Sequence, residues 1–204
     1  MVDLKPMPER EKFLHAFEMV SLYQKNVLPF VEDHLGFGEM HNLRSIWQAA
    51  IGPIREADSD QDKYVQAYSN WLWIAHCSHN TLADELPRDD VLEYKRLLLR
   101  LYKQQKNTSR LLLLRMLRMH TVLSKALLYE MQWMTPVELT NCSSSQVTCV
   151  VHHCKVLQTS GTERICRVDC RNIGSAYARQ LYNLKRVTEL NNHGCTMTLT
   201  PVEK

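Results

Sequence analysis

The sequence lacks the short motifs that mark several common classes of enzyme. It contains no GxGxxG or GxxxxGK[ST] phosphate-binding loop, no HExxH metalloprotease motif and no GxSxG nucleophile turn. It also has no CxxC pair, a spacing at which a tight turn directs two thiolates to one zinc ion. Dinucleotide oxidoreductases, P-loop enzymes, zinc proteases and the usual esterases therefore lose support.

Charge and hydropathy argue against two further classes of partner. The net charge is only +3, from 25 basic and 22 acidic residues, so we expect no nucleic-acid partner. The most apolar stretch, residues 111–134, is interrupted by charges that each cost roughly 2.5–3.5 kcal/mol at a bilayer centre, so we expect no membrane partner. The first residues show no secretory signal, and we expect a cytoplasmic protein. A homodimer through the leucine-rich stretch is an alternative to a monomer.

Hydrophobic periodicity predicts an α+β fold with two parts. Residues 1–136 show apolar side chains at helical spacing and form a helical scaffold. In residues 137–204 the pattern changes to β-favouring alternation around residues 147–151, 186–190 and 195–200, with a helix over 165–182. We expect a helical N-terminal bundle packed against a small C-terminal antiparallel sheet with one helix, within one compact domain.

Turn and cap residues predict where several elements begin and end. Pro29 implies a kink or a boundary in the first helix, and Ser59 supplies the N-cap of a later one. Residues 107–109 cap a long helix that ends near Met134. Gly194 lies in the hairpin between the last two strands, where a positive φ favours glycine.

Sulfur is concentrated in the last third of the chain. Six of the seven cysteines lie there: Cys142, Cys149, Cys154, Cys166, Cys170 and Cys195. In a reducing compartment they stay free thiols unless they bind metal or act chemically. We expect no metal and no cofactor. Two alternatives are thiols that pack as small apolar side chains and a structural zinc site built on Cys166 and Cys170.

Nucleophilic catalysis by a thiol requires a neighbouring base or cation. Cys154 follows two histidines, and strand alternation places His152 on its face of the chain. Cys170 is the second candidate, on the predicted helix, and Arg186 is suited to bind a substrate carboxylate. Asp169, beside Cys170, is interpreted as part of a solvated charged face.

A second histidine cluster is interpreted as structural. His76 and His79 lie three residues apart on one helix face and adjoin Trp71 and Trp73. We interpret this segment as a capped, partly buried helix end and not as a pair of metal ligands.

Seven residues of the terminal part follow an order found in a known family. They are Cys154, Gly161, Cys170, Arg186, Thr188, Gly194 and Cys195. This order resembles the three-cysteine C-terminal module of the bacterial L-2-amino-thiazoline-4-carboxylate hydrolase-like proteins, over about residues 147–200. The sequence departs from the pattern in having the additional Cys166 and in placing Cys195 directly after its glycine.

The resemblance implies a cysteine-dependent hydrolase or lyase in specialised metabolism. Its substrate would be a small amino-acid-derived ring, and a C–N or C–S bond would be cleaved. A thiolate at Cys154 or Cys170 would attack the C=N carbon. His152 or His193 would move protons, and Arg186 would hold the carboxylate.

The remaining predicted contacts are less specific. Asn192 in the hairpin and Trp71 in the helical scaffold are candidate substrate-binding residues, and the aromatic helices would shield the pocket. The alternative function is a noncatalytic sensory module whose helical pocket binds a tetrapyrrole or zinc.

Overall fold

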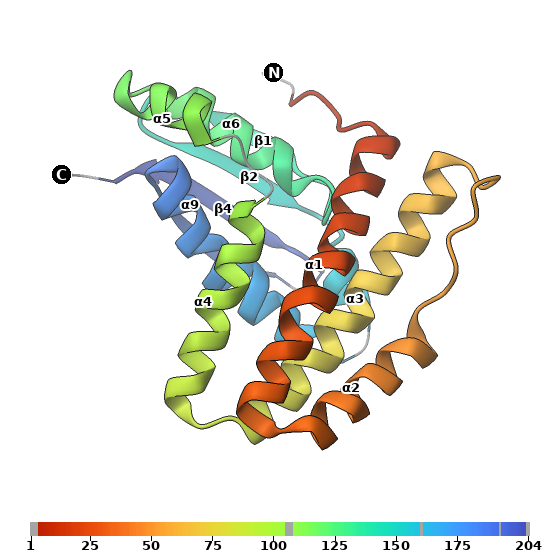
Figure 1. The fold of residues 1–204 in the computed structure, drawn as a ribbon. Coiled ribbons are helices and arrows are strands. Elements are labelled where there is room, and N and C mark those ends of the chain that lie inside the picture. Colours follow the sequence, from red (N-terminus) through yellow and green to blue (C-terminus); the bar gives the residue numbers. More distant parts are fainter. Residues whose placement is uncertain (1–3, 105–107, 160, 192, 203–204) are drawn as a thin grey trace.

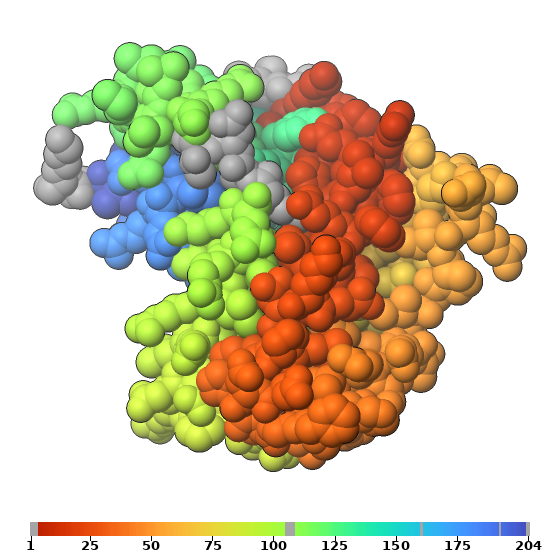
Figure 2. All heavy atoms as spheres, viewed as in Figure 1, coloured from red at the N-terminus to blue at the C-terminus, as the bar shows by residue number. Residues whose placement is uncertain are grey.

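The structure is a computed structural model that describes residues 4–104, 108–159, 161–191 and 193–202. Helices come first and a four-stranded antiparallel sheet follows at the C-terminus, which confirms the predicted α+β fold. The first helices are α1 (Glu9–Leu35), α2 (Phe37–Ala50), α3 (Asp60–Glu85) and α4 (Arg88–Gln104). Helix α1 packs along α3, and α1 and α4 lie side by side on the face that Figure 2 shows.

The ends of these helices follow from local chemistry. Ser59 caps α3, because its hydroxyl accepts a hydrogen bond from the Asp62 amide at 3.2 Å. Gly36 separates α1 from α2 with φ = +89°, a conformation that costs glycine little. Pro29 lies inside α1, which continues as one helix.

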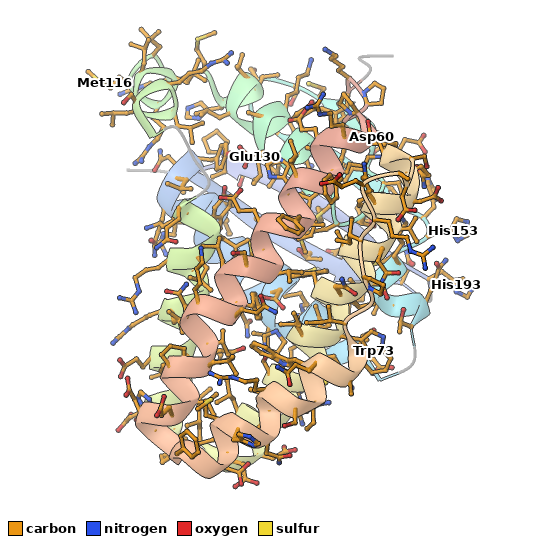
Figure 3. All side chains as sticks on the ribbon, turned by 45° about the vertical axis from the view of Figure 1, so that its right-hand side comes forward. Asp60, Trp73, Met116, Glu130, His153 and His193 are labelled. Atoms are coloured by element: carbon orange, nitrogen blue, oxygen red, sulfur yellow. The ribbon has the colours of Figure 1, made fainter. Side chains whose placement is uncertain are left out.

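The predicted long helix before Met134 is two helices. They are α5 (Thr108–Met116) and α6 (His120–Met131), and Asn107 lies outside the described residues. Arg118, between them, has φ = +52°, so the chain turns there and α5 points away from the bundle (Figure 1). Met116, at the end of α5, is 73% exposed and lies at the edge of the molecule (Figure 3).

The C-terminal sheet has the strand order β1-β2-β4-β3. Its strands are β1 (Glu138–Cys142), β2 (Val147–Val151), β3 (Leu184–Leu190) and β4 (Cys195–Pro201), of which β1 was not predicted. The two central strands are buried on one face, where Cys149 lies opposite Met197. Gly194 lets the β3–β4 hairpin approach the end of β2 closely, since a Cβ there would lie 1.7 Å from the Val151 carbonyl oxygen.

A chain of short helices connects β2 to β3. It runs through α7 (Lys155–Gln158), α8 (Glu163–Ile165), the π-helix η1 (Cys166–Ile173) and α9 (Gly174–Tyr182). The predicted helix over residues 165–182 is therefore present, but it contains a stretch of π geometry, which is frequent at functional sites. Helix α9 packs against β3, and η1 and α9 both contact α4 (Figure 1).

No helix within the described ranges combines the length and the apolar character needed to cross a membrane.

Candidate functional site

A buried carboxylate joins the helical bundle to the terminal lobe. Asp169 of η1 is 3% exposed, and its Oδ2 lies 2.6 Å from Nε2 of His79 on α3. Its Oδ1 accepts hydrogen bonds from Tyr23 of α1 and Tyr102 of α4, each at 3.3 Å. Three helices therefore supply donors to one carboxylate, and a buried charge requires such partners.

The hydroxyl and imidazole groups around Asp169 are suited to remain donors. Burial, followed by the neighbouring Asp169 carboxylate, raises the pKa of Tyr23 and of Tyr102 well above the usual value. An ionised carboxylate only accepts hydrogen bonds, so Nε2 of His79 carries a proton. Its Nδ1 lies 3.0 Å from the hydroxyl of Tyr94, so both ring nitrogens have partners. The network fixes η1 against the bundle.

A small pocket borders this network and has a volume of about 60 Å³. About 10–15 Å³ of such space holds one water, so the pocket has room for roughly four to six water-sized groups. Its wall is formed by α4, α6 and the residues after it, η1, α9 and β3. The lining residues are Tyr102, Leu127, Glu130, Met131, Trp133, Met134, Asp169, Cys170, Ile173, Gly174, Tyr177 and Arg186.

Arg186 brings a positive charge into the wall of this pocket. Its side chain extends from β3 toward α9, and the residue is 8% exposed. Within the described part of the chain it makes one hydrogen bond, from Nε to Oγ1 of Thr188 at 3.3 Å, and no ion pair. A Cβ on Gly174 would lie 2.4 Å from Nη1 of Arg186, so the glycine makes room for the guanidinium.

Cys170 lies in the same wall as Arg186. Burial raises the pKa of its thiol well above the usual range, and Arg186 acts in the opposite direction. Burial also raises the pKa of Cys149 to about 12 and that of Cys195 to about 11, again against the effect of Arg186. These cysteines are therefore neutral thiols at neutral pH, and Arg186 is a cation among them.

The other two predicted catalytic positions in the β2–α7 segment do not line the pocket. Cys154 is buried at the start of α7, and its amide donates to the His193 carbonyl at 2.9 Å. His152 is on the surface, with its Nε2 3.0 Å from a carboxylate oxygen of Glu138 and its side chain 61% exposed. The predicted common face of His152 and Cys154 ends with β2, because the chain bends at residues 152–153.

The remaining predicted residues lie away from the pocket or outside the described part of the chain. His193 is exposed at the edge of the molecule (Figure 3). Trp71 is fully buried, with its ring centroid 4.9 Å from that of Trp133, so it supports the pocket wall from behind. Asn192 is outside the described residues.

For two residues of the site, the structure differs from the interpretation based on the sequence. His79 is 1% exposed and is the hydrogen-bond partner of Asp169, and Asp169 is not part of a solvated face. A sequence signal for Asp169 exists: Cys166 three residues before it and Ile173 four residues after it place it on an apolar stripe. The aromatic residues of the wall are Tyr102, Trp133 and Tyr177, none of which was predicted as a site residue.

Comparisons with known proteins do not identify a function for this site. A scan against protein-family models found no matching family, and searches of curated proteins and of solved structures found no significant match. The resemblance based on the order of cysteines and glycines therefore stays a prediction. No cluster of three or more potential metal-binding side chains occurs among the described residues.

Proposed function

We propose that the pocket is the active site of a cysteine-dependent hydrolase or lyase that acts on a small, carboxylate-bearing, amino-acid-derived ring. The observation that carries the proposal is the buried Arg186, which makes no ion pair within the described ranges and shares a pocket wall with Cys170. A buried guanidinium favours an anionic partner, and a carboxylate matches its planar donors. The pocket volume of about 60 Å³ is enough for the ring of such a substrate, and its substituents would extend beyond the pocket.

In this proposal Cys170 is the nucleophile, and its proton must be removed as it attacks. Because burial keeps the thiol neutral, one of the two carboxylates in the wall, Asp169 or Glu130, takes the proton. The sulfur forms a bond to the C=N carbon, and the π electrons of that bond move to nitrogen, which gains the thiol proton. The tetrahedral carbon then expels a second nitrogen as an amine, which leaves with a proton from the first nitrogen, and the C=N bond forms again. Water adds to this bond, and the carbon–sulfur bond to Cys170 breaks, so that a carbonyl product and the neutral thiol result.

The His79–Asp169 pair also has a positioning role in this proposal. Asp169 holds the backbone of η1 against three helices, and Cys170 is the next residue along that backbone. A fixed nucleophile lowers the barrier, since a displacement of about 1 Å can reduce the rate about 100-fold. His152 and His193 have no part in the proposed chemistry.

A noncatalytic ligand-binding module is the second candidate. The observation in its favour is that burial raises the thiol pKa of Cys170, which makes the free thiol unreactive. The pocket volume favours a small anion over a tetrapyrrole in such a module.

Turnover of 2-amino-thiazoline-4-carboxylate by purified variants separates these candidates. We expect Cys170→Ser to abolish turnover and Cys154→Ser to retain it. Gly174→Ala, which places a methyl group against Arg186, should reduce kcat/KM about 100-fold. Gly38→Ala is the matched control, because a Cβ there would have no neighbour within 4 Å.

Mass spectrometry of thiol alkylation gives an independent readout. With the substrate carboxylate bound, Cys170 should be protected from iodoacetamide, whereas Cys142 at the surface end of β1 should be labelled equally with and without substrate. Turnover that survives Cys170→Ser, or saturable substrate binding with no turnover by any variant, would contradict the enzymatic proposal. The second of these results would support the binding module.

A further inference from the structure

A second, larger hollow lies on the other side of Arg186. This groove has a volume of about 810 Å³, and it is open to solvent along the junction of α9 with β3 and β4. Its lining residues are Ser145, Ser175, Arg179, Lys185, Arg186, Thr200, Pro201 and Val202. They include three cations, three hydroxyl groups and no carboxylate.

No described residue around this groove balances its positive charges. Among the described residues, neither Arg179 nor Lys185 forms an ion pair or a side-chain hydrogen bond, and Arg186 bonds only to Thr188. Three like charges along one groove repel one another, and an anion in the groove would relieve that repulsion. Surface cations often remain solvated, but Arg186 is only 8% exposed and cannot be hydrated as an exposed arginine is.

Arg186 also connects this groove with the pocket. Gly174, against which its Nη1 packs, lines the pocket, and the next residue, Ser175, lines the groove. The guanidinium therefore stands at the boundary between the two hollows. A ligand that contacts Arg186 from the groove side lies next to a ligand group in the pocket.

We propose that the groove is a binding site for a phosphate-type oxyanion. A dianion with several acceptor oxygens matches two arginines, one lysine and neighbouring hydroxyls better than a single carboxylate does. The assignment of this oxyanion to the substrate rests on the proposed function. The substrate would place its reactive ring in the pocket and a phosphorylated group in the groove. The volume of the groove suits a group much larger than the ring.

Isothermal titration calorimetry of the full chain with inorganic phosphate, at constant ionic strength, tests the anion site. We expect saturable binding by the wild type and at least about tenfold weaker binding by Arg179→Ala/Lys185→Ala. Arg167→Ala/Arg171→Ala is the matched control, because it also removes two positive charges from the same lobe, at exposed positions of η1 outside the groove. It should bind phosphate within about twofold of the wild type.

The competing outcomes are distinct. Absence of saturable phosphate binding, or equal weakening in both double variants, would overturn the site, since equal weakening reports only net charge. Acetate that binds as tightly as phosphate would also overturn it, because a carboxylate site does not require a dianion. Cys170→Ser should bind phosphate normally, so a failure of the catalytic proposal leaves this measurement unaffected.

Discussion

Replacement of Asp169 by asparagine should destabilise the protein strongly. The carboxylate is 3% exposed and accepts bonds from an imidazole and two phenols, at 2.6 Å, 3.3 Å and 3.3 Å. An asparagine has one acceptor oxygen and would direct its NH₂ group at one of these donors. A buried donor left unsatisfied costs roughly 1–3 kcal/mol, which for a chain of this length lowers Tm by about 5 °C.

Urea unfolding followed by circular dichroism measures this loss. The control is Asp84→Asn, which replaces an aspartate that pairs with Arg164 at 3.3 Å. The Asp84 side chain is 66% exposed, and its loss should cost at most about 1 kcal/mol. A double-mutant cycle of Asp169→Asn with His79→Gln should give a coupling of about 1.5 kcal/mol or more. Equal effects of the two aspartate variants would refute the account of a buried hub.

Three further results are expected. Cys149 and Cys195 have pKa values raised by burial from 9.0 to about 12 and about 11, so above pH 9.0 the unfolded chain binds fewer protons than the fold. The free energy of unfolding should therefore fall as pH rises from 9.0 to about 11, by at most about 1.4 kcal/mol per pH unit for each thiol. Unfolding under reducing conditions at several pH values measures this change. A free energy that does not vary with pH would contradict the burial of these thiols. Gly194→Ala should cost about 2 kcal/mol or more in urea unfolding, because its Cβ would collide with a backbone oxygen, and a loss below about 0.5 kcal/mol would show that the hairpin can shift. His152→Ala should leave turnover within about twofold and stability within about 1 kcal/mol, because its ion pair with Glu138 is exposed; a large loss of turnover would restore a catalytic role.

Much of the fold could be predicted because it depends on local patterns. Helical periodicity, the Ser59 cap and the alternation of the last two strands are properties of neighbouring residues, and the structure contains each of them. The first strand, β1, was missed because its burial depends on pairing with β2 and not on its own alternation. The break at Arg118 was missed because a left-handed arginine has no marked local preference.

The site was predicted less completely, since its residues come from distant parts of the chain. Cys170 and Arg186 share a pocket, although they lie 16 positions apart in the sequence. The pairing of Asp169 with His79 spans 90 residues, and nothing in either segment specifies the other. His152 was chosen because it precedes Cys154 by two residues, but the bend after β2 places one at the surface and the other in the core.

The π-helix η1 makes the spacing of this segment intolerant of length changes. In such a turn each amide bonds one residue further back than in an α-helix, so the segment holds a surplus residue relative to a regular helix. Deletion of the exposed Asn172, which lies between Asp169 and Gly174, would allow α-helical winding and rotate Asp169 by about 100° relative to Gly174. Asp169 could then meet His79, or Arg186 could remain beside Gly174, but the shortened chain could not satisfy both attachments.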